Sequence, residues 1–347
     1  MGTKNDPAFP DFLIILRPSP SKSRVPPLKE FMLRIESAIA LISRSLRAAS
    51  VGCRGGLSLL TLAFLVAIPV PSRAQETPYF VTYSHDLEEP GDLDIELKNV
   101  GGAPARTNAF AGSSLELEYG ATGWWTTEFY LSGQATASDS TIFTGFRWEN
   151  RVRPFLQEHW INPVLYVEFE DINAADKNLL EVVGHDSISD LSGSNAANRR
   201  EKLREMELKL ILSRNWKGWN FSENTIFEKN LSNSPWEFGY AAGASRPLSL
   251  AASPNRCVFC AENFVAGVEM YGGLGDRYTP GLHDTSHYLS PAVAWTIPHA
   301  ATLSFGPGFG LNDHSAGVLL RFGVSTEIEQ FGNHLPWAKK RGREVTR

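Results

Sequence analysis

Acidic side chains recur at every second residue through much of this sequence, and they are its most abundant candidates for chemistry. Two close carboxylates could perform acid–base catalysis, provided that one of them has a raised pKa. Here the acids are numerous and evenly spaced, so a surface lined with carboxylates explains them better than a catalytic pair. The acids concerned are Glu116, Glu118, Glu128, Glu149, Glu168, Glu170, Glu207, Glu237 and Glu269, and the bases among them are Arg147, Lys209 and Arg321.

Two serine–histidine neighbours, Ser286-His287 and His314-Ser315, are the candidates for nucleophilic catalysis. A serine nucleophile needs a base within about 3 Å and a third group that orients the base. Adjacent side chains of a strand point to opposite faces, and neither pair has the His-x-Ser-Asn pattern of membrane lipases and deacylases. We therefore interpret both pairs as polar turn residues and expect no enzyme, with a lipid hydrolase as the less favoured alternative.

Two of the three cysteines, Cys257 and Cys260, are separated by two residues. No histidine follows Cys260, so the motif for covalent haem attachment is absent. One such pair supplies two zinc ligands where a structural site needs four. In an oxidising compartment the favoured state is a local disulfide, with a metal site or a redox pair as weaker alternatives. We expect no metal and no cofactor.

The acids alternate with apolar residues, and this pattern with period two indicates β-strands. Leu115, Leu117 and Tyr119, for example, alternate with Glu116 and Glu118. About twelve segments of this kind follow Asp92, each about 7–11 residues long. Tyr79–Ser84 could add one short strand. In Trp219–Lys229 the register stays open, because Glu223 and Ile226 break the alternation.

The connections between these segments differ in length on the two sides of the predicted sheet. Tight turns are expected at Gly120–Gly123, Asn215–Gly218 and Pro298–His299, and longer loops at Asn99–Ser113, Asp171–Arg204 and Gly275–Thr285. Arg151–Ile161 and Pro247–Asn263 break the rule on the short side, and a short helix is expected within Asn195–Glu205. This asymmetry is typical of bacterial transmembrane barrels, which have an even number of strands.

The fold class that we predict is all-β, a transmembrane antiparallel up-and-down β-barrel of about 12 strands spanning residues 75–331. A soluble β-sandwich also alternates, but it would bury its apolar face between two sheets. Aromatic residues mark the segment ends, as the interfacial girdle of a barrel requires, which favours the barrel. Those residues are Trp124, Trp125, Trp148, Tyr166, Trp216, Trp219, Trp236 and Trp295.

The first 74 residues have the features of a secretory signal peptide and leader. Leu57–Val70 is an apolar run preceded by arginines, and Ser72-Arg73-Ala74 is a small-x-small cleavage site. The run is short for a membrane anchor, and the leader is long enough that Met32 could be the true start. We expect export and cleavage after Ala74, residence in the bacterial outer membrane, and a basic C-terminal tail at residues 332–347.

The leader carries four of the 38 acidic and ten of the 33 basic residues, which leaves a formal net charge of −11 for the remainder. Such a chain is unsuited to bind nucleic acid. A charge costs about 2–4 kcal/mol on the lipid face of a barrel, so the acids should face the lumen. We predict a passive channel for small solutes with an acidic, cation-preferring lumen. The alternative is a non-conducting structural or surface-exposed barrel, whose lumen is filled by ion pairs.

The C-terminal third carries a resemblance to a known family of barrels. Tyr288–Ile328 contains a Ser-Pro that opens a strand, a Gly-Leu-Asn-Asp turn and a final Arg-Phe-Gly strand. In these features it resembles the MetA-pathway of phenol degradation family, and TYSHDLEEPG and GVEMYGGLGD are similar to segments of uncharacterised outer-membrane proteins of soil bacteria. The resemblance implies an outer-membrane barrel with a presumed transport role and no catalytic residues. Ser315–Phe322 also resembles the signal read by the outer-membrane assembly machinery, which is an expected partner beside outer-membrane lipid.

Overall fold

The computed structural model describes residues 77–104, 108–178, 181–232, 234–253 and 257–334. The predicted leader and signal peptide at residues 1–74 lie outside the described residues, as does residue 335 onward of the predicted tail. No helix among the described residues is long and apolar enough to cross a membrane.

The described chain consists almost entirely of β-strands. The strands are β1 Leu93–Gly102, β2 Phe110–Thr122, β3 Trp125–Thr136, β4 Thr141–Val152, β5 Asn162–Asn173, β6 Lys202–Trp216, β7 Trp219–Asn230, β8 Trp236–Pro247, β9 Phe264–Asp276, β10 His287–Ile297, β11 Ala301–Phe305, β12 Gly308–Gly310 and β13 Val318–Ile328. The helical pieces are one turn each, η1 Asp190–Ser192, α3 Asn195–Asn198, η2 Ala261–Asn263 and α4 Phe331–His334.

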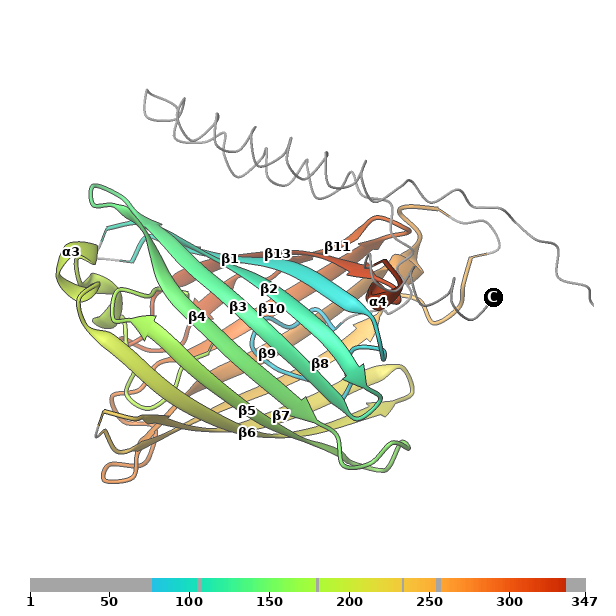
Figure 1. Ribbon diagram of the computed structural model, residues 1–347, viewed down its shortest axis with the longest axis horizontal. Coiled ribbons are helices and arrows are strands. Elements are labelled where there is room, and N and C mark those ends of the chain that lie inside the picture. Colours follow the sequence, from blue (N-terminus) through green and yellow to red (C-terminus); the bar gives the residue numbers. More distant parts are fainter. Residues whose placement is uncertain (1–76, 105–107, 179–180, 233, 254–256, 335–347) are drawn as a thin grey trace, which may run out of the picture. The chain divides into compact units, whose positions relative to one another are not determined.

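The strands form one antiparallel sheet that closes on itself as a barrel (Figure 1). Each strand pairs with its neighbours in sequence, and β1 pairs with β13 from Leu93↔Ile328 to Gly102↔Leu319. Because β11 and β12 both lie between β10 and β13, they occupy one position in the wall. The barrel therefore has twelve strand positions, which confirms the predicted count and excludes a sandwich of two open sheets.

The wall of the barrel has a polar inner face and an apolar outer face, as the alternation predicts. In β3, for example, Glu128 and Tyr130 are buried inside while Phe129 and Leu131 are exposed outside. Closure gives every strand a hydrogen-bonding neighbour on both sides, so the wall has no open edge. A sheet of this kind can place its apolar face against lipid without leaving backbone groups unpaired.

Strand β7 has the register that the sequence left open. Asn220, Ser222, Asn224 and Ile226 are buried inside the barrel, whereas Phe221 and Phe227 are exposed. Glu223 therefore points outward, where its carboxylate accepts a hydrogen bond of 2.9 Å from Thr225 Oγ1. Ile226 breaks the polar pattern because the interior is filled at this level rather than open to water.

The connections follow the predicted asymmetry. Two residues join β6 to β7 at Lys217-Gly218, where both φ angles are positive, and three join β10 to β11. At the opposite end, residues 174–201 separate β5 from β6 and contain α3, the short helix expected in this region. Two long connections, at residues 153–161 and 248–263, lie at the end of the barrel that also holds the starts of β1 and α4. We call this the terminal end and the other the loop end.

Candidate functional site

The candidate site is the interior of the barrel. The nine acids and three bases that the sequence predicts for the lumen all lie on strands of the wall and point into this interior. Most of them form buried groups, in which Arg147 and Lys209 each contact two or more carboxylates. Arg147 lies 2.7 Å from Glu170, and Lys209 lies 2.7 Å from Glu207. The remaining short contacts are Arg147 with Glu168 at 3.7 Å and with Asp176 at 3.1 Å, Lys209 with Glu181 at 2.8 Å, and Arg321 with Glu269 at 3.6 Å.

Two cations on the inner face of the wall were not among the predicted lumen residues. Lys98 in β1 lies 2.6 Å from Glu116, and Arg151 in β4 contacts Glu118, Glu128 and Glu149. Arg151 follows Glu149 by two residues and therefore shares its face, which the alternation could have revealed. The predicted connection Arg151–Ile161 begins too early, because β4 continues to Val152. With both cations counted, the interior is acidic but strongly ion-paired.

Residues 77–92, the inner segment, run through the barrel instead of adding a strand to its wall. Tyr79–Ser84 does not form the additional short strand that the sequence allows, because it has no strand pairing. Its backbone is bound by side chains of the wall: the N–H groups of Phe80, Val81 and Thr82 donate to the Glu269 carboxylate at 3.0–3.1 Å. Asn224 accepts from Tyr83 N at 2.6 Å and donates to Tyr83 O at 3.0 Å.

A second insert, the covering loop of residues 174–178 and 181–201, closes the barrel from the loop end. Val182 and Leu191 of this loop pack into the apolar cluster that contains Phe80 and Val81. Asn195 is fully buried, and its side-chain oxygen accepts a hydrogen bond of 2.9 Å from Gln134. The inner segment and the covering loop therefore meet inside the barrel, and together they occupy much of its lumen.

An acidic cavity of about 420 Å³ remains between the covering loop and β4–β8. Its charged lining consists of Glu170, Asp176, Glu181, Asp186, Asp190, Glu205, Glu228 and Glu237, with Arg147 as the one cation among the described lining residues. Burial raises the pKa of Asp186 to about 8, although a hydrogen bond from Val183 N opposes the shift. Asp186 is then mostly protonated at neutral pH, but the other carboxyl groups still outnumber the single guanidinium, which makes this cavity favourable for cations.

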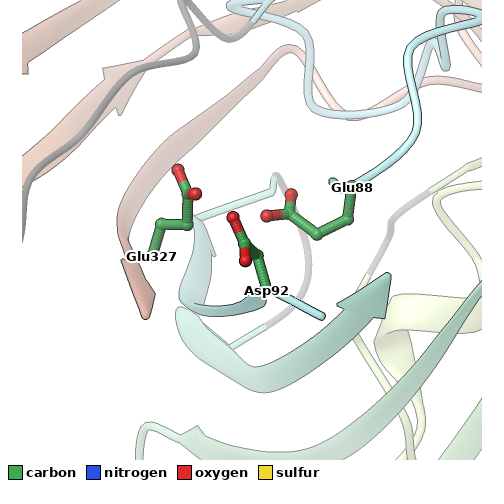
Figure 2. Close-up of side chains that lie close together, drawn as sticks. All are labelled: Glu88, Asp92 and Glu327. Carbon is green, nitrogen blue, oxygen red and sulfur yellow. The ribbon is translucent and has the colours of Figure 1, made fainter. Parts of the chain in front are cut away.

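Several groups of three carboxylates have the oxygen donors that a hard cation prefers. Ligand atoms lie within 4.8 Å of one another in Glu168–Glu170–Glu181, in Glu170–Glu205–Glu228 and in Glu116–Glu118–Glu128. A further group, Glu88–Asp92–Glu327, lies at the terminal end, where Figure 2 shows the three carboxylates facing one another. The expectation of no metal stays a prediction, since lumen acids of this kind also occur without an ion.

Glu88 couples the inner segment to pH. Its burial raises its pKa to about 7, with a further increase from Asp92 and a partial offset from Arg151. A carboxyl whose pKa is higher in the folded state stabilises that state below pH 4.5, and this contribution is lost as the pH rises through 7. Glu88 should therefore hold the inner segment more firmly at pH 5 than at pH 8.

The substitution Glu88→Gln tests this coupling. It should reduce the fall in stability between pH 5 and pH 8 by about 2 kcal/mol, after allowance for partial solvent exposure. Urea unfolding in lipid vesicles at both pH values measures the difference. Glu89→Gln is the matched control because Glu89 is exposed. An unchanged pH dependence in Glu88→Gln would contradict the assignment.

The serine–histidine neighbours are not arranged for nucleophilic attack. Ser315 Oγ donates to His287 O at 2.9 Å and to Asn312 Oδ1 at 2.7 Å, and Ser286 Oγ donates to His314 O at 2.8 Å. Both hydroxyls thus serve the backbone of a loop, and neither contacts an imidazole ring among the described residues. This geometry offers no support for the lipid hydrolase alternative at these positions.

Cys257 and Cys260 form a disulfide in the connection between β8 and β9, with their Cα atoms 5.3 Å apart. The connection that it closes lies outside the barrel, away from the acidic interior. The aromatic ring of Phe259, between the two cysteines, stacks on Trp295 of the outer wall with ring centroids 4.8 Å apart.

No protein family and no curated protein matches the sequence. Among solved structures, the chain is similar to an outer membrane channel of Pseudomonas putida F1, at 12% identity and a TM-score of 0.44, over 70% of this chain and 97% of the other. It is also similar to LpxR from Salmonella typhimurium, at 11% identity, a TM-score of 0.35 and coverage of 67% and 99%. OprB of Pseudomonas putida gives 7% identity, a TM-score of 0.32 and coverage of 68% and 91%. At these values the likeness is one of general architecture.

Proposed function

We propose that this chain is an outer-membrane β-barrel that acts as a passive, cation-preferring channel for small solutes, and that the described conformation is its closed state. The acidic cavity at the loop end carries the proposal. The apolar outer face and the closed sheet fit a lipid environment, in which only helices and closed barrels can span. Export by a cleaved signal peptide, and insertion by the assembly machinery through the C-terminal strand, belong to the same proposal.

The preference for cations follows from the charge of the cavity. Field lines from its carboxylates are focused by the surrounding low-dielectric wall, which raises the local concentration of cations and excludes anions. Deeper in the barrel the acids are neutralised by Arg151 and Lys209. The cavity therefore acts as the selective entrance, and the ion-paired interior behind it is the barrier to be opened.

The closed state depends on the inner segment, which is held by side chains rather than by strand pairing. Its hydrogen bonds to Glu269 and Asn224 can be exchanged for water without breaking the wall. A non-conducting barrel is the second candidate, and the dense ion pairing of the interior favours it. The two candidates differ in whether release of the inner segment gives a conducting path.

Planar bilayer recordings of the refolded chain from Gln75 onward test the proposal. Under a KCl gradient the reversal potential should indicate a cation-to-anion permeability ratio of roughly five to ten. The triple variant Glu170→Gln, Glu205→Gln and Glu228→Gln should lower this ratio at least about twofold, because it neutralises the cavity. Asp171→Asn is the control, since Asp171 pairs with Lys202 on the exposed outer side. Anion preference, or an unchanged ratio in the triple variant, would contradict the proposal.

A further inference from the structure

The two long connections at the terminal end carry several large apolar side chains that are exposed. In a barrel of this kind such connections are usually short and polar. Phe259 is 74% exposed and Trp160 is 70% exposed. The other exposed apolar residues of the two connections are Phe155, Leu156, Ile161, Leu248, Leu250 and Val258.

The connection between β8 and β9 folds back onto the outer wall of the barrel. Phe259 stacks on Trp295, whose Nε1 donates a hydrogen bond of 3.0 Å to Val258 O. Trp295 in turn stacks on Phe264 with the rings only 4° from parallel. Both wall residues lie on the outward-facing set of their strands, together with the exposed Val268 and Val293. The disulfide-closed tip thus continues the apolar outer face.

The same connection also reaches the turn between β6 and β7. A Cβ on Gly218 would lie 2.6 Å from a methyl carbon of Leu250, so Leu250 packs directly over this turn. Trp216 and Trp219 flank the turn and are exposed on the outside. Leu250 and the two tryptophans therefore lie together at this turn on the outside of the barrel, and Phe259 covers Trp295 from the same connection.

Three basic side chains lie over the tryptophan rings of this surface. Arg214 lies 4.9 Å from the ring of Trp160, Lys217 lies 4.9 Å from that of Trp216, and Arg246 lies 5.8 Å from that of Trp219. None of the three cations forms an ion pair with a carboxylate among the described residues. Their charges can therefore pair with an external anion. The tryptophan rings beside them are of the type that favours the membrane interface.

We propose that this surface, the anchor patch, is embedded in the lipid leaflet at the terminal end and binds anionic phospholipid headgroups. The anchor patch consists of Trp160, Trp216, Trp219, Leu250 and Phe259 with Arg214, Lys217 and Arg246. It is continuous with the apolar outer face, and its charge complements an anionic headgroup. Near such a surface each basic residue strengthens binding roughly fivefold. The proposal rests on the membrane location of the barrel and not on its conductance.

A fluorescent label on the anchor patch tests its lipid exposure. Leu250→Cys, in the chain that starts at Gln75, is labelled with the environment-sensitive dye NBD and refolded into phosphatidylcholine–phosphatidylglycerol vesicles. Nitroxide-labelled lipid should quench NBD at position 250 at least about threefold more than NBD at Gly332→Cys, a control at the same end with open space around its Cβ. Heat-modified migration on gels checks folding. Equal quenching at both positions would overturn the proposal, and the anchor patch would then be better explained as a binding surface for another protein.

The headgroup preference has its own measurement. Quenching at position 250 by nitroxide-labelled phosphatidylglycerol should exceed that by nitroxide-labelled phosphatidylcholine about threefold. The triple variant Arg214→Gln, Lys217→Gln and Arg246→Gln should lower this ratio to about one while the label stays in lipid. A ratio of one in the parent protein, or an unchanged ratio in the triple variant, would overturn the assignment to anionic lipid. Because no current is recorded, these results are independent of whether the barrel conducts.

Discussion

A barrel that lacks residues 77–88 should carry a mean current at least about tenfold higher than the full chain from Gln75 in planar bilayers. Three backbone N–H groups of the inner segment converge on the single buried carboxylate of Glu269. A hydrogen bond to a charged group contributes about 1.5–3 kcal/mol, so the inner segment leaves the lumen only rarely in the full chain. The deletion removes this part of the barrier, leaves the covering loop in place and leaves every strand of the wall intact.

A point substitution should give an intermediate result. Glu269→Gln keeps the size of the side chain but loses the negative charge that attracts the three N–H groups and Arg321. We expect more frequent openings than in the wild-type chain and fewer than in the deletion. Glu262→Gln is the matched control, because this carboxylate binds Ser253 outside the barrel. If the deletion variant folds but carries no more current than the full chain, the inner segment is not the barrier and the closed-state part of the channel proposal fails.

The wall of the barrel could be predicted because the residue types along each strand alternate between those that face lipid and those that face the interior. Alternation with period two gives the face of every side chain, and Glu128 and Phe129 show how sharply the two faces differ. The same rule even located the exception in β7, where Glu223 and Ile226 break the pattern. Their outward and inward positions follow from the pairing with β6 and β8, which no single strand reveals.

The filling of the barrel could not be predicted in this way. Tyr79–Ser84 has the composition of a strand, yet its partner is the carboxylate of Glu269, some 190 positions away in the sequence. Periodicity reports which face is polar, but it does not report whether water or protein occupies that side. The closed interior depends on contacts between the inner segment, the covering loop and the wall, such as the apolar cluster that includes Phe80 and Val182. Such long-range contacts leave no local pattern.

Arg151→Met should be the most destabilising single substitution that we propose, with a loss of about 3–5 kcal/mol of unfolding free energy. The guanidinium lies 2.5 Å from Glu118 and 3.2 Å from Glu149, it also contacts Glu128, and it packs 5.1 Å from the ring of Tyr83. Methionine fills a similar volume but leaves three carboxylates close together without their shared cation. Both the wall and the inner segment lose a contact.

Lys202→Met is the matched control for this loss. Lys202 forms an ion pair of 2.9 Å with Asp171, but it lies on the exposed side of the barrel. Exposed ion pairs contribute at most about 1 kcal/mol, so the control should unfold close to the wild-type chain in urea titrations in lipid vesicles. The deficit of Arg151→Met should also shrink as the pH falls, because protonated glutamates no longer repel one another. Equal losses in the two variants, or a deficit that does not depend on pH, would mean that the interior cluster is solvated rather than buried. In that case Arg151 would not be required to hold Glu118, Glu128 and Glu149 close together in the closed barrel.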